Sequence, residues 1–247
     1  MRETGPKSSL RLPGAGLLRR LVRRLPRRDT REPGALNHIS LGSHCHMAQI
    51  LKAEGLRTWS GPFDWIFSAP GMVRDCLADD FSGLLDRSHY ESTPLAERTA
   101  PHETRCRHRL YRERHAIPFV FNHHDPATSE ADYRFLEAGI RRMRTALDTP
   151  GTDNRFYLMT TVPTDDAVFP EIRKLLAARR AQSHLTVLEL VPGAEEPATV
   201  ELAREPRFTR LRVETRSPST GIRFADPADD AFVTALVRGR ARLLREP

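Results

Sequence analysis

The sequence predicts an α/β fold in which a mainly parallel central sheet lies between two layers of helices. Short runs of apolar and β-branched residues alternate with longer segments whose apolar residues recur at helical spacing. This alternation is typical of strand–helix–strand units with parallel strands. The length of 247 residues suits one domain, and the 3 cysteines form no close pairs. The sequence therefore predicts a three-layer domain that depends on a hydrophobic core.

The first predicted unit is a strand, a tight turn and a helix. An apolar run over residues 36–41 predicts a buried strand, and Gly42 permits a sharp turn after it. Ser43 is a favourable helix N-cap, and Gly55 ends the helix that follows. This unit places Cys45 in the first helical turn.

The later elements follow from the same periodicities. Residues 86–116 lack a clear period and predict an irregular excursion with a short strand near 107–111. The regular elements are predicted as a helix over 72–85, a strand over 117–121, a helix over 129–147, a strand over 155–162, a helix over 168–180, strands over 184–191 and 208–213, and a closing helix over 229–244. In such a fold, sites form at the carboxyl ends of the strands.

The net charge of +7 arises in the N-terminal segment. Residues 1–33 carry ten basic and three acidic residues, whereas residues 34–247 carry equal numbers of each. A surface that tracks phosphates needs a local excess of positive charge, so the domain is not expected to bind nucleic acid. The chain is therefore predicted to consist of a basic, disordered N-terminal arm, residues 1–33, and one α/β domain, residues 34–247.

The arm contains the sequence LLRRLVRRLPRR, with apolar residues on one helical side and arginines on the other. A solvated arm is the favoured interpretation, because prolines and glycines limit any helix to about nine residues. A helix that contacts an anionic membrane surface and a mitochondrial-type targeting segment are the alternatives. The sequence has no apolar run of about 18 residues, and its odd number of cysteines fits a reducing compartment, so we expect a cytoplasmic protein.

Cys45 is the residue with the clearest chemical potential. In the first turn of a helix, unpaired backbone N–H groups and the helix dipole favour an anion. A cysteine there can have its pKa lowered from about 8.5 to roughly 3.5–7.5, particularly beside a protonated histidine. The alternative is that Cys45 is a small, buried apolar residue.

The segments SLGSHCHMAQILKAEGLR and GPFDWIFS resemble the opening motifs of a bacterial family, the putative papain-like cysteine peptidases. That family has a Ser-Leu-Gly-x-x-Cys turn, a helix, a Pro-Phe-Asp-Trp loop and a strand that ends in a His-Asp pair. Here FVFNHHD at residues 119–125 matches the pair, and an arginine-bearing helix at residues 140–144 follows. The resemblance covers residues 36–148 and extends weakly to GIRFADPADDAF. It implies a thiol hydrolase and, as an alternative to the three-layer fold, a papain-like α+β fold.

The predicted function is a cysteine peptidase, or a related thiol hydrolase or acyltransferase, acting on an amide, ester or thioester of a peptide or other acyl substrate. Cys45 is the predicted nucleophile. The resemblance implies His124 as its base, with His123 as the alternate, because adjacent residues of a strand point to opposite faces. The carboxylate that orients the base is Asp64 or Asp125. An equally open role for Asp64 is structural, capping a turn or pairing with an arginine.

Other parts of the site and two rival functions stay open. The backbone N–H groups at Cys45 and His46 are the predicted oxyanion hole. One rival is a non-catalytic binding or processing module linked to surface-polysaccharide functions, in which arginines within 141–144 hold an anionic group. The other is a metal-binding protein that uses His44, Cys45, His46, His123, His124 and Asp125. Our prediction for the thiol hydrolase includes neither a cofactor nor a metal.

Overall fold

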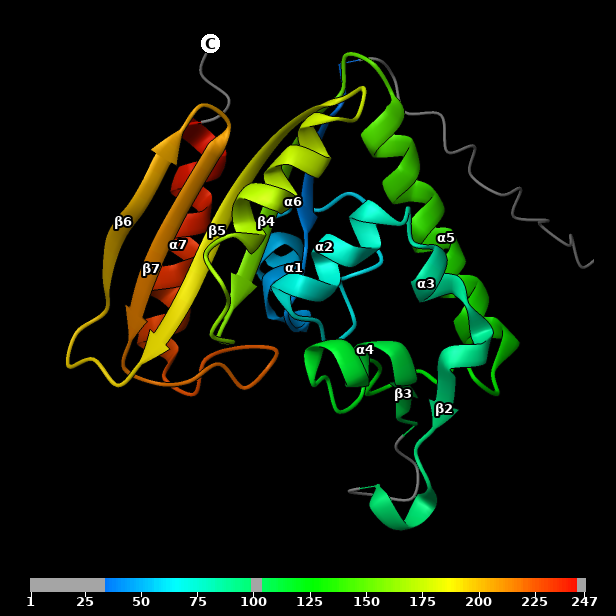
Figure 1. Ribbon diagram of the computed structural model, residues 1–247. Coiled ribbons are helices and arrows are strands. Elements are labelled where there is room, and N and C mark those ends of the chain that lie inside the picture. Colours follow the sequence, from blue (N-terminus) through cyan, green and yellow to red (C-terminus); the bar gives the residue numbers. More distant parts are fainter. Residues whose placement is uncertain (1–33, 99–103, 244–247) are drawn as a thin grey trace, which may run out of the picture. The chain divides into compact units, whose positions relative to one another are not determined.

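The computed structural model of the protein describes residues 34–98 and 104–243 (Figure 1). Its main sheet has five strands in the order β1-β4-β5-β7-β6. These strands are β1 Leu36–Ser40, β4 Asp153–Thr160, β5 Gln182–Pro192, β6 Ala198–Glu205 and β7 Phe208–Thr215. Strands β1, β4, β5 and β7 pair in parallel, and β6 pairs antiparallel with β7 at one edge.

Helices connect the strands and cover the sheet. They are α1 Cys45–Ala53, α2 Pro70–Ala78, α3 Ser82–Leu85, α4 Arg109–His115, α5 Glu130–Asp148, α6 Val168–Ala177 and α7 Pro227–Leu243, with 3₁₀ turns at Arg87–His89 and Leu95–Glu97. A small antiparallel sheet joins β2 Tyr90–Ser92 to β3 Cys106–His108. None of the helices in the described ranges is long and apolar enough to cross a membrane.

Each face of the sheet packs on its own group of helices. Within β4, Phe156 and Leu158 belong to one apolar cluster, whereas Tyr157 and Met159 belong to the other. The first cluster includes residues of α2, α5 and α6, and the second includes residues of α1 and α7. Figure 1 shows α6 in front of the sheet and α7 behind it. Because both faces are covered, the strands are apolar on both sides, as parallel strands usually are. The predicted three-layer α/β architecture is confirmed.

The topology changes direction at the carboxyl ends of two neighbouring strands. Strand β1 leads into α1 on one face, whereas its neighbour β4 leads into α6 on the opposite face. The two connections diverge at this point, and open α/β sheets bind ligands where such a divergence occurs. The turn that leads to Cys45 leaves β1 at this point.

The predicted strand over residues 117–121 is wrong. Only Phe121 forms an isolated bridge, to Cys106. The N–H groups of Val120 and Phe121 both donate to the Cys106 carbonyl, and the Val120 carbonyl accepts from Phe67 N–H. With its backbone groups divided between two loops, and with Pro118 lacking an N–H, the segment cannot form a regular ladder.

Two further boundaries differ from the expectation. The predicted helix over 72–85 is split into α2 and α3, because Asp80 and Phe81 have positive φ values of 50° and 65°. Strand β6 was not predicted, because most of its residues are exposed and its sequence lacks a buried face. The predicted basic arm, residues 1–33, lies outside the described residues, so the division of the chain into arm and domain stays a prediction.

Replacing Phe169 with alanine tests the packing of α6 on the sheet. Phe169 is fully buried in the first apolar cluster. The Phe169→Ala change removes buried apolar surface and leaves a cavity, so the free energy of unfolding should fall by about 3–5 kcal/mol in urea titrations. Val200→Ala is the control, because Val200 is 44% exposed on β6 and should change stability by less than about 0.5 kcal/mol. Equal effects of the two changes would contradict this packing.

Candidate active site

The turn before Cys45 is held on two sides by backbone hydrogen bonds. Ser43 N–H donates to the Met159 carbonyl over 2.8 Å, and Met159 N–H donates to the Gly42 carbonyl over 3.0 Å. On the other side, Ser68 N–H donates to the Ser43 carbonyl over 3.0 Å. The turn is therefore fixed between strand β4 and the loop that contains the Pro-Phe-Asp-Trp sequence.

Gly42 is required at this turn for two reasons. Its φ is +90°, a conformation that other residues rarely adopt, and a Cβ atom there would collide with Ser68 Oγ. Ser68 is buried, and its Oγ has no hydrogen-bond partner among the described residues. A buried hydroxyl with an unused donor therefore lies directly against the turn.

The predicted N-cap is wrong. Ser43 Oγ donates to the Met159 carbonyl over 2.9 Å, and the N-cap of α1 is His44, whose side chain makes no capping hydrogen bond. The second hydrogen bond from Ser43 to β4 is the physical reason for the difference. As a result, no side chain caps the N–H groups of the first turn, and Cys45 is the first residue of the helix.

The Cys45 thiol has a raised pKa, contrary to the expectation from sequence. Burial is the main cause, and the charge of Asp64 adds to it, whereas the backbone N–H of Cys45 acts in the opposite direction. The helix N-terminus thus favours the thiolate, but desolvation outweighs that effect. The side chain is partly exposed, so a reagent or substrate can reach the sulfur.

Asp64 is a buried carboxylate held by an arginine. Its Oδ2 accepts a hydrogen bond of 2.5 Å from Arg57 Nη1 and one of 3.1 Å from Gly61 N–H. Burial raises the pKa of Asp64 to about 6, against the lowering effect of Arg57 and, more weakly, Arg142. No histidine among the described residues bonds to Asp64. These contacts are those expected if Asp64 is structural, capping a turn and pairing with an arginine. A role for Asp64 in orienting the base stays a prediction.

In the segment FVFNHHD, residues 119–125, His124 lies beside the carboxylate of Asp132, a residue that the sequence analysis did not select. His124 Nδ1 donates to Asp132 Oδ1 over 2.9 Å, and the His124 ring stacks on Phe135. Burial acts to raise the pKa of Asp132, but hydrogen bonds from the Asp125 backbone and from His124 hold that pKa below its ordinary value. The signal in the sequence was weak: an acid eight positions after the histidine, in the first turn of α5, where Ser129 Oγ accepts from Asp132 N–H.

Asp125 and His123, which belong to the same segment, contact other residues. Asp125 is buried and accepts hydrogen bonds from Ser92 Oγ over 2.6 Å and from Ala127 N–H over 3.2 Å. His123 Nε2 lies 3.2 Å from the side-chain nitrogen of Asn122. Within the described ranges, no hydrogen bond joins Cys45 to His123 or His124. The pairing of the thiol with either imidazole stays a prediction.

His46 connects α1 to the loop between β7 and α7. Its Nε2 donates to Asp230 Oδ1 over 3.1 Å, and its Nδ1 accepts from Ser219 Oγ over 2.8 Å. The ring is almost fully buried, and burial lowers the His46 pKa despite the opposing effect of Asp230. Both nitrogens are occupied, so His46 anchors the loop and is not available as a base for Cys45.

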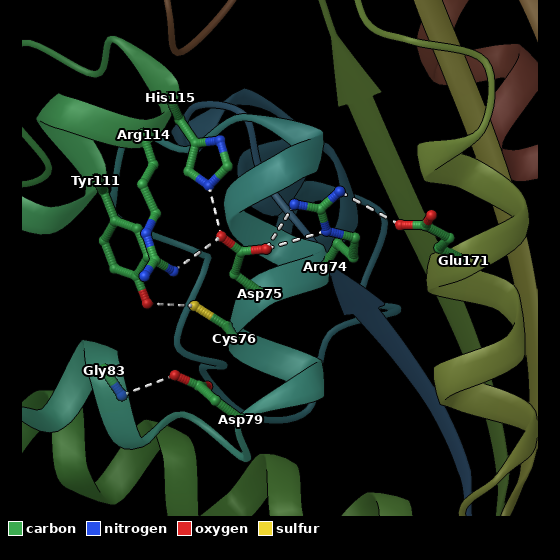
Figure 2. Close-up of polar contacts among 9 residues, drawn as sticks. All are labelled: Arg74, Asp75, Cys76, Asp79, Gly83, Tyr111, Arg114, His115 and Glu171. Atoms are coloured by element: carbon green, nitrogen blue, oxygen red, sulfur yellow. Dashed lines mark hydrogen bonds and ion pairs between the residues drawn. The ribbon is translucent and has the colours of Figure 1, made fainter.

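A third histidine–carboxylate pair links α4 to α2 (Figure 2). His115 Nε2 donates to Asp75 Oδ2 over 2.8 Å, and Arg114 lies 3.7 Å from the same oxygen. Arg74 binds the other oxygen of Asp75 and reaches Glu171 on α6. This ionic chain fastens α4, α2 and α6 together at the carboxyl edge of the sheet.

The same chain forms one wall of a cavity of about 470 Å³. Arg74, Arg114 and His115 line it together with the start of α2 and the loop over residues 162–165 after β4. In the chain, Ala69 of this wall follows Ser68 directly, and Val162 lies three residues after Met159, the two residues that hold the Cys45 turn.

The candidate metal ligands are not gathered into a site. Across residues 34–98 and 104–243, no group of three or more histidine, cysteine, aspartate or glutamate side chains has the arrangement needed to hold a metal ion. Of the six residues named in the metal hypothesis, His46 and Asp125 make the hydrogen bonds described above with other partners.

Comparison with known proteins identifies one similar family. Residues 36–188, more than half of the chain, match the family described as "Putative papain-like cysteine peptidase (DUF1796)". No curated protein and no solved structure gives a significant match. The matched residues include the Cys45 turn, the Pro-Phe-Asp-Trp loop and the histidine motif.

The contribution of Asp64 to the Cys45 pKa can be measured by alkylation. Because the Asp64 charge raises the thiol pKa, Asp64→Asn should move the midpoint of Cys45 alkylation by iodoacetamide to lower pH. In the unchanged protein that midpoint should lie above the ordinary value of about 8.5. Mass spectrometry resolves each cysteine, and Cys76 and Cys106, both buried, serve as unreactive internal controls. A midpoint that does not differ between the two proteins would contradict the electrostatic contact.

The raised pKa of Asp64 also predicts a pH dependence of stability. The folded protein holds this proton up to about pH 6, whereas the unfolded chain releases it near pH 4. Stability from the protonated carboxyl is therefore fully present below about pH 4 and is lost as the pH rises to about 6. Relative to Asp64→Asn, the free energy of unfolding should fall by about 3 kcal/mol across this window. Urea titrations at several pH values measure it, and parallel curves for the two proteins would refute it.

Proposed function

Since this chain belongs to the putative papain-like cysteine peptidase family, we propose that it is a thiol hydrolase or acyltransferase with Cys45 as its nucleophile. The substrate is an acyl compound, an amide, ester or thioester, and the leaving group is an amine, alcohol or thiol. The observation that carries the proposal is the position of Cys45, at the uncapped first turn of α1, where the connections from the neighbouring strands β1 and β4 diverge.

The first turn of α1 suits the stabilisation of a developing oxyanion. No side chain caps this helix end, so the N–H groups of Cys45 and His46 are free of side-chain acceptors. Backbone N–H groups fixed at a helix start need no reorganisation when negative charge forms on a bound carbonyl oxygen. The hydrogen bonds from β4 and Ser68 to the turn keep these donors in place.

A base is needed because burial keeps the thiol protonated in the free protein. A nucleophile of this kind is activated by an imidazole that a third group orients. Two described histidines have this arrangement: Asp132 holds Nδ1 of His124, and Asp75 holds Nε2 of His115. His124 is the one that lies in the segment matching the His-Asp pair, and its Nε2 is left as the proton acceptor. We assign the base to His124 and its orientation to Asp132, in place of Asp64 or Asp125.

The Pro-Phe-Asp-Trp loop joins the two halves of the proposed pair. Phe67 contacts the His44 ring at a centroid distance of 5.5 Å, next to Cys45, and its N–H donates to the Val120 carbonyl. Trp65 and Pro62, in the same loop, line a narrow cleft with His124. Since no hydrogen bond joins the thiol to the imidazole within the described residues, the proposal requires that the pair align when substrate binds.

The proposed reaction has two steps. His124 takes the proton of Cys45, and the sulfur attacks the carbonyl carbon to form a thioester, while the departing amine, alcohol or thiol receives that proton. Water, or another acyl acceptor, then attacks the thioester carbon, and His124 returns the acceptor's proton to the cysteine. The cavity of about 470 Å³ beside α2 is large enough for a small acyl group.

Substitution of Cys45 and His124 tests the proposal. The full chain is incubated with an amide, an ester and a thioester substrate, and turnover and acylation of Cys45 are followed by intact-mass spectrometry. Cys45→Ala should abolish both, and His124→Ala should lower kcat by about 10²–10⁴-fold. His123→Ala is the matched control, because His123 is adjacent and exposed, and should leave turnover unchanged.

Thermal melting of each variant separates a chemical effect from unfolding. Cys45→Ala removes only one partly exposed sulfur, so its melting temperature should stay close to that of the unchanged protein. If the unchanged protein forms no acyl adduct with any of the three substrates, or if Cys45→Ala retains turnover, the hydrolase proposal is refuted and a non-catalytic binding module takes its place.

A further inference from the structure

A second cavity lies at the opposite edge of the sheet from the Cys45 turn. It has a volume of about 400 Å³, within the range of small-molecule sites. Its walls are the start of β5, the turn between β6 and β7, and the last part of α7. In Figure 1 these segments lie at the upper edge, where α7 ends, whereas β4, β5 and β7 have their carboxyl ends at the lower edge. The residues that line it are His184, Leu185, Thr186, Arg204, Glu205, Arg207, Phe208, Thr209 and Arg240.

Positive groups dominate the walls of this cavity. Arg204, Arg207 and Arg240 line it directly, and His184 stands at the start of β5. Arg155, whose side chain is only 7% exposed, is the partner of His184 in the β4–β5 register. Three guanidinium groups and an imidazole therefore line one hollow, and the guanidinium of Arg155 lies behind the imidazole on the neighbouring strand.

Carboxylates offset only part of this charge. Asp153 accepts a hydrogen bond of 2.5 Å from Arg155 and lies 3.7 Å from His184. Glu201 binds Arg204 through both oxygens and lies 3.6 Å from Arg240. Asp153 therefore offsets Arg155, and Glu201 offsets the charge of one of the two arginines that share it.

The remaining acid, Glu205, is engaged elsewhere. It forms an ion pair with Arg173, a residue of α6 on the other face of the sheet. Arg207 has no ion pair within the described part of the chain. The excess positive charge therefore belongs to Arg207 and to the pair Arg204 and Arg240, which share the single carboxylate of Glu201.

The cations affect one another electrostatically. Burial is the main cause of the lowered pKa of His184, and the charges of Arg155 and Arg207 lower it further. Burial likewise lowers the pKa of Arg155, partly against the attraction of Asp153, and Arg207 adds to the lowering. Like charges held together at the wall of a cavity are stabilised when an anion occupies it.

The geometry points to a binding site for a small organic phosphate, with the phosphate group on Arg207 and Arg240. Guanidinium groups present paired N–H donors that match phosphate oxygens, and a net excess of two positive charges suits a dianion. Thr186 and Thr209, direct neighbours in the β5–β7 register, add hydroxyl groups to the same wall. The volume exceeds the need of a bare ion and leaves room for the organic part of a monoester.

Calorimetric titration of the full chain tests this site. The probes are glycerol phosphate, inorganic phosphate and acetate, each at the same ionic strength, because salt screens such contacts. Both phosphates should bind saturably, the ester more tightly, and acetate should not compete. Arg207→Gln and Arg240→Gln should each weaken phosphate binding by about tenfold or more, as expected for the loss of a charge-assisted hydrogen bond.

Arg212→Gln is the matched control. Arg212 is an exposed residue of the same strand β7, and it alternates in side-chain direction with Thr209. The Arg212→Gln change should leave the affinity for both phosphates unchanged. Arg207→Gln is the variant that is safe for folding, because Arg207 is an exposed turn residue without an ion pair in the described part of the chain. Absence of saturable binding, equal affinity in Arg207→Gln, or equal binding of acetate would each overturn the proposal.

Discussion

The double attachment of the turn at Ser43 is the constraint on which the candidate site depends. Its backbone N–H continues the β1–β4 ladder to Met159, while its carbonyl accepts from Ser68 in the Pro-Phe-Asp-Trp loop. One residue thus belongs both to the sheet and to the loop. Because Gly42 allows the loop to approach this closely, α1 starts at Cys45 beside the loop and not at a distance from it. The Ser-Leu-Gly and Pro-Phe-Asp-Trp motifs are therefore two halves of one structural unit.

Two opposing effects act on the pKa of the Cys45 thiol in this structural unit. A helix start favours the thiolate by a modest amount, since the dipole effect is worth about 0.3–1 kcal/mol. Burial and the Asp64 charge act against it and leave the Cys45 pKa raised. A buried acid that is paired with Arg57 stabilises the loop, but it does so at the expense of thiol reactivity in the free protein. An imidazole base has to supply the missing activation.

The fold was predictable because the strands of a parallel sheet are apolar on both faces and alternate with amphipathic helices. The prediction of strand 117–121 failed for a local reason: Ile117, Phe119 and Phe121 have the composition of a strand, but their neighbours' backbone groups bond to Cys106 and Phe67. The position of Cys45 at a helix start followed from Gly42 and the periodicity after it. The partners of the histidines did not, because Asp132, Asp75 and Asp230 approach His124, His115 and His46 through tertiary packing. The Asp75 and Asp230 contacts join residues 40 and 184 positions apart, which no local pattern encodes, and the acid eight positions after His124 is only a weak signal.

Helix α7 connects the two edges of the sheet at which charged groups gather. Near its start, Asp230 binds His46, the residue after Cys45, and near its end Arg240 lines the basic cavity. Ten residues of α-helix separate them by about 15 Å, nearly twice the screening length of about 8 Å at physiological ionic strength. Direct electrostatic influence of an anion in the cavity on the thiol is therefore weak. Any coupling between the two edges would have to pass through displacement of α7 against the sheet, and the buried contacts of Val233 and Val237 with the second apolar cluster oppose such a displacement. The chemistry at the Cys45 turn and the charge at the opposite edge are thus physically separable properties of one sheet.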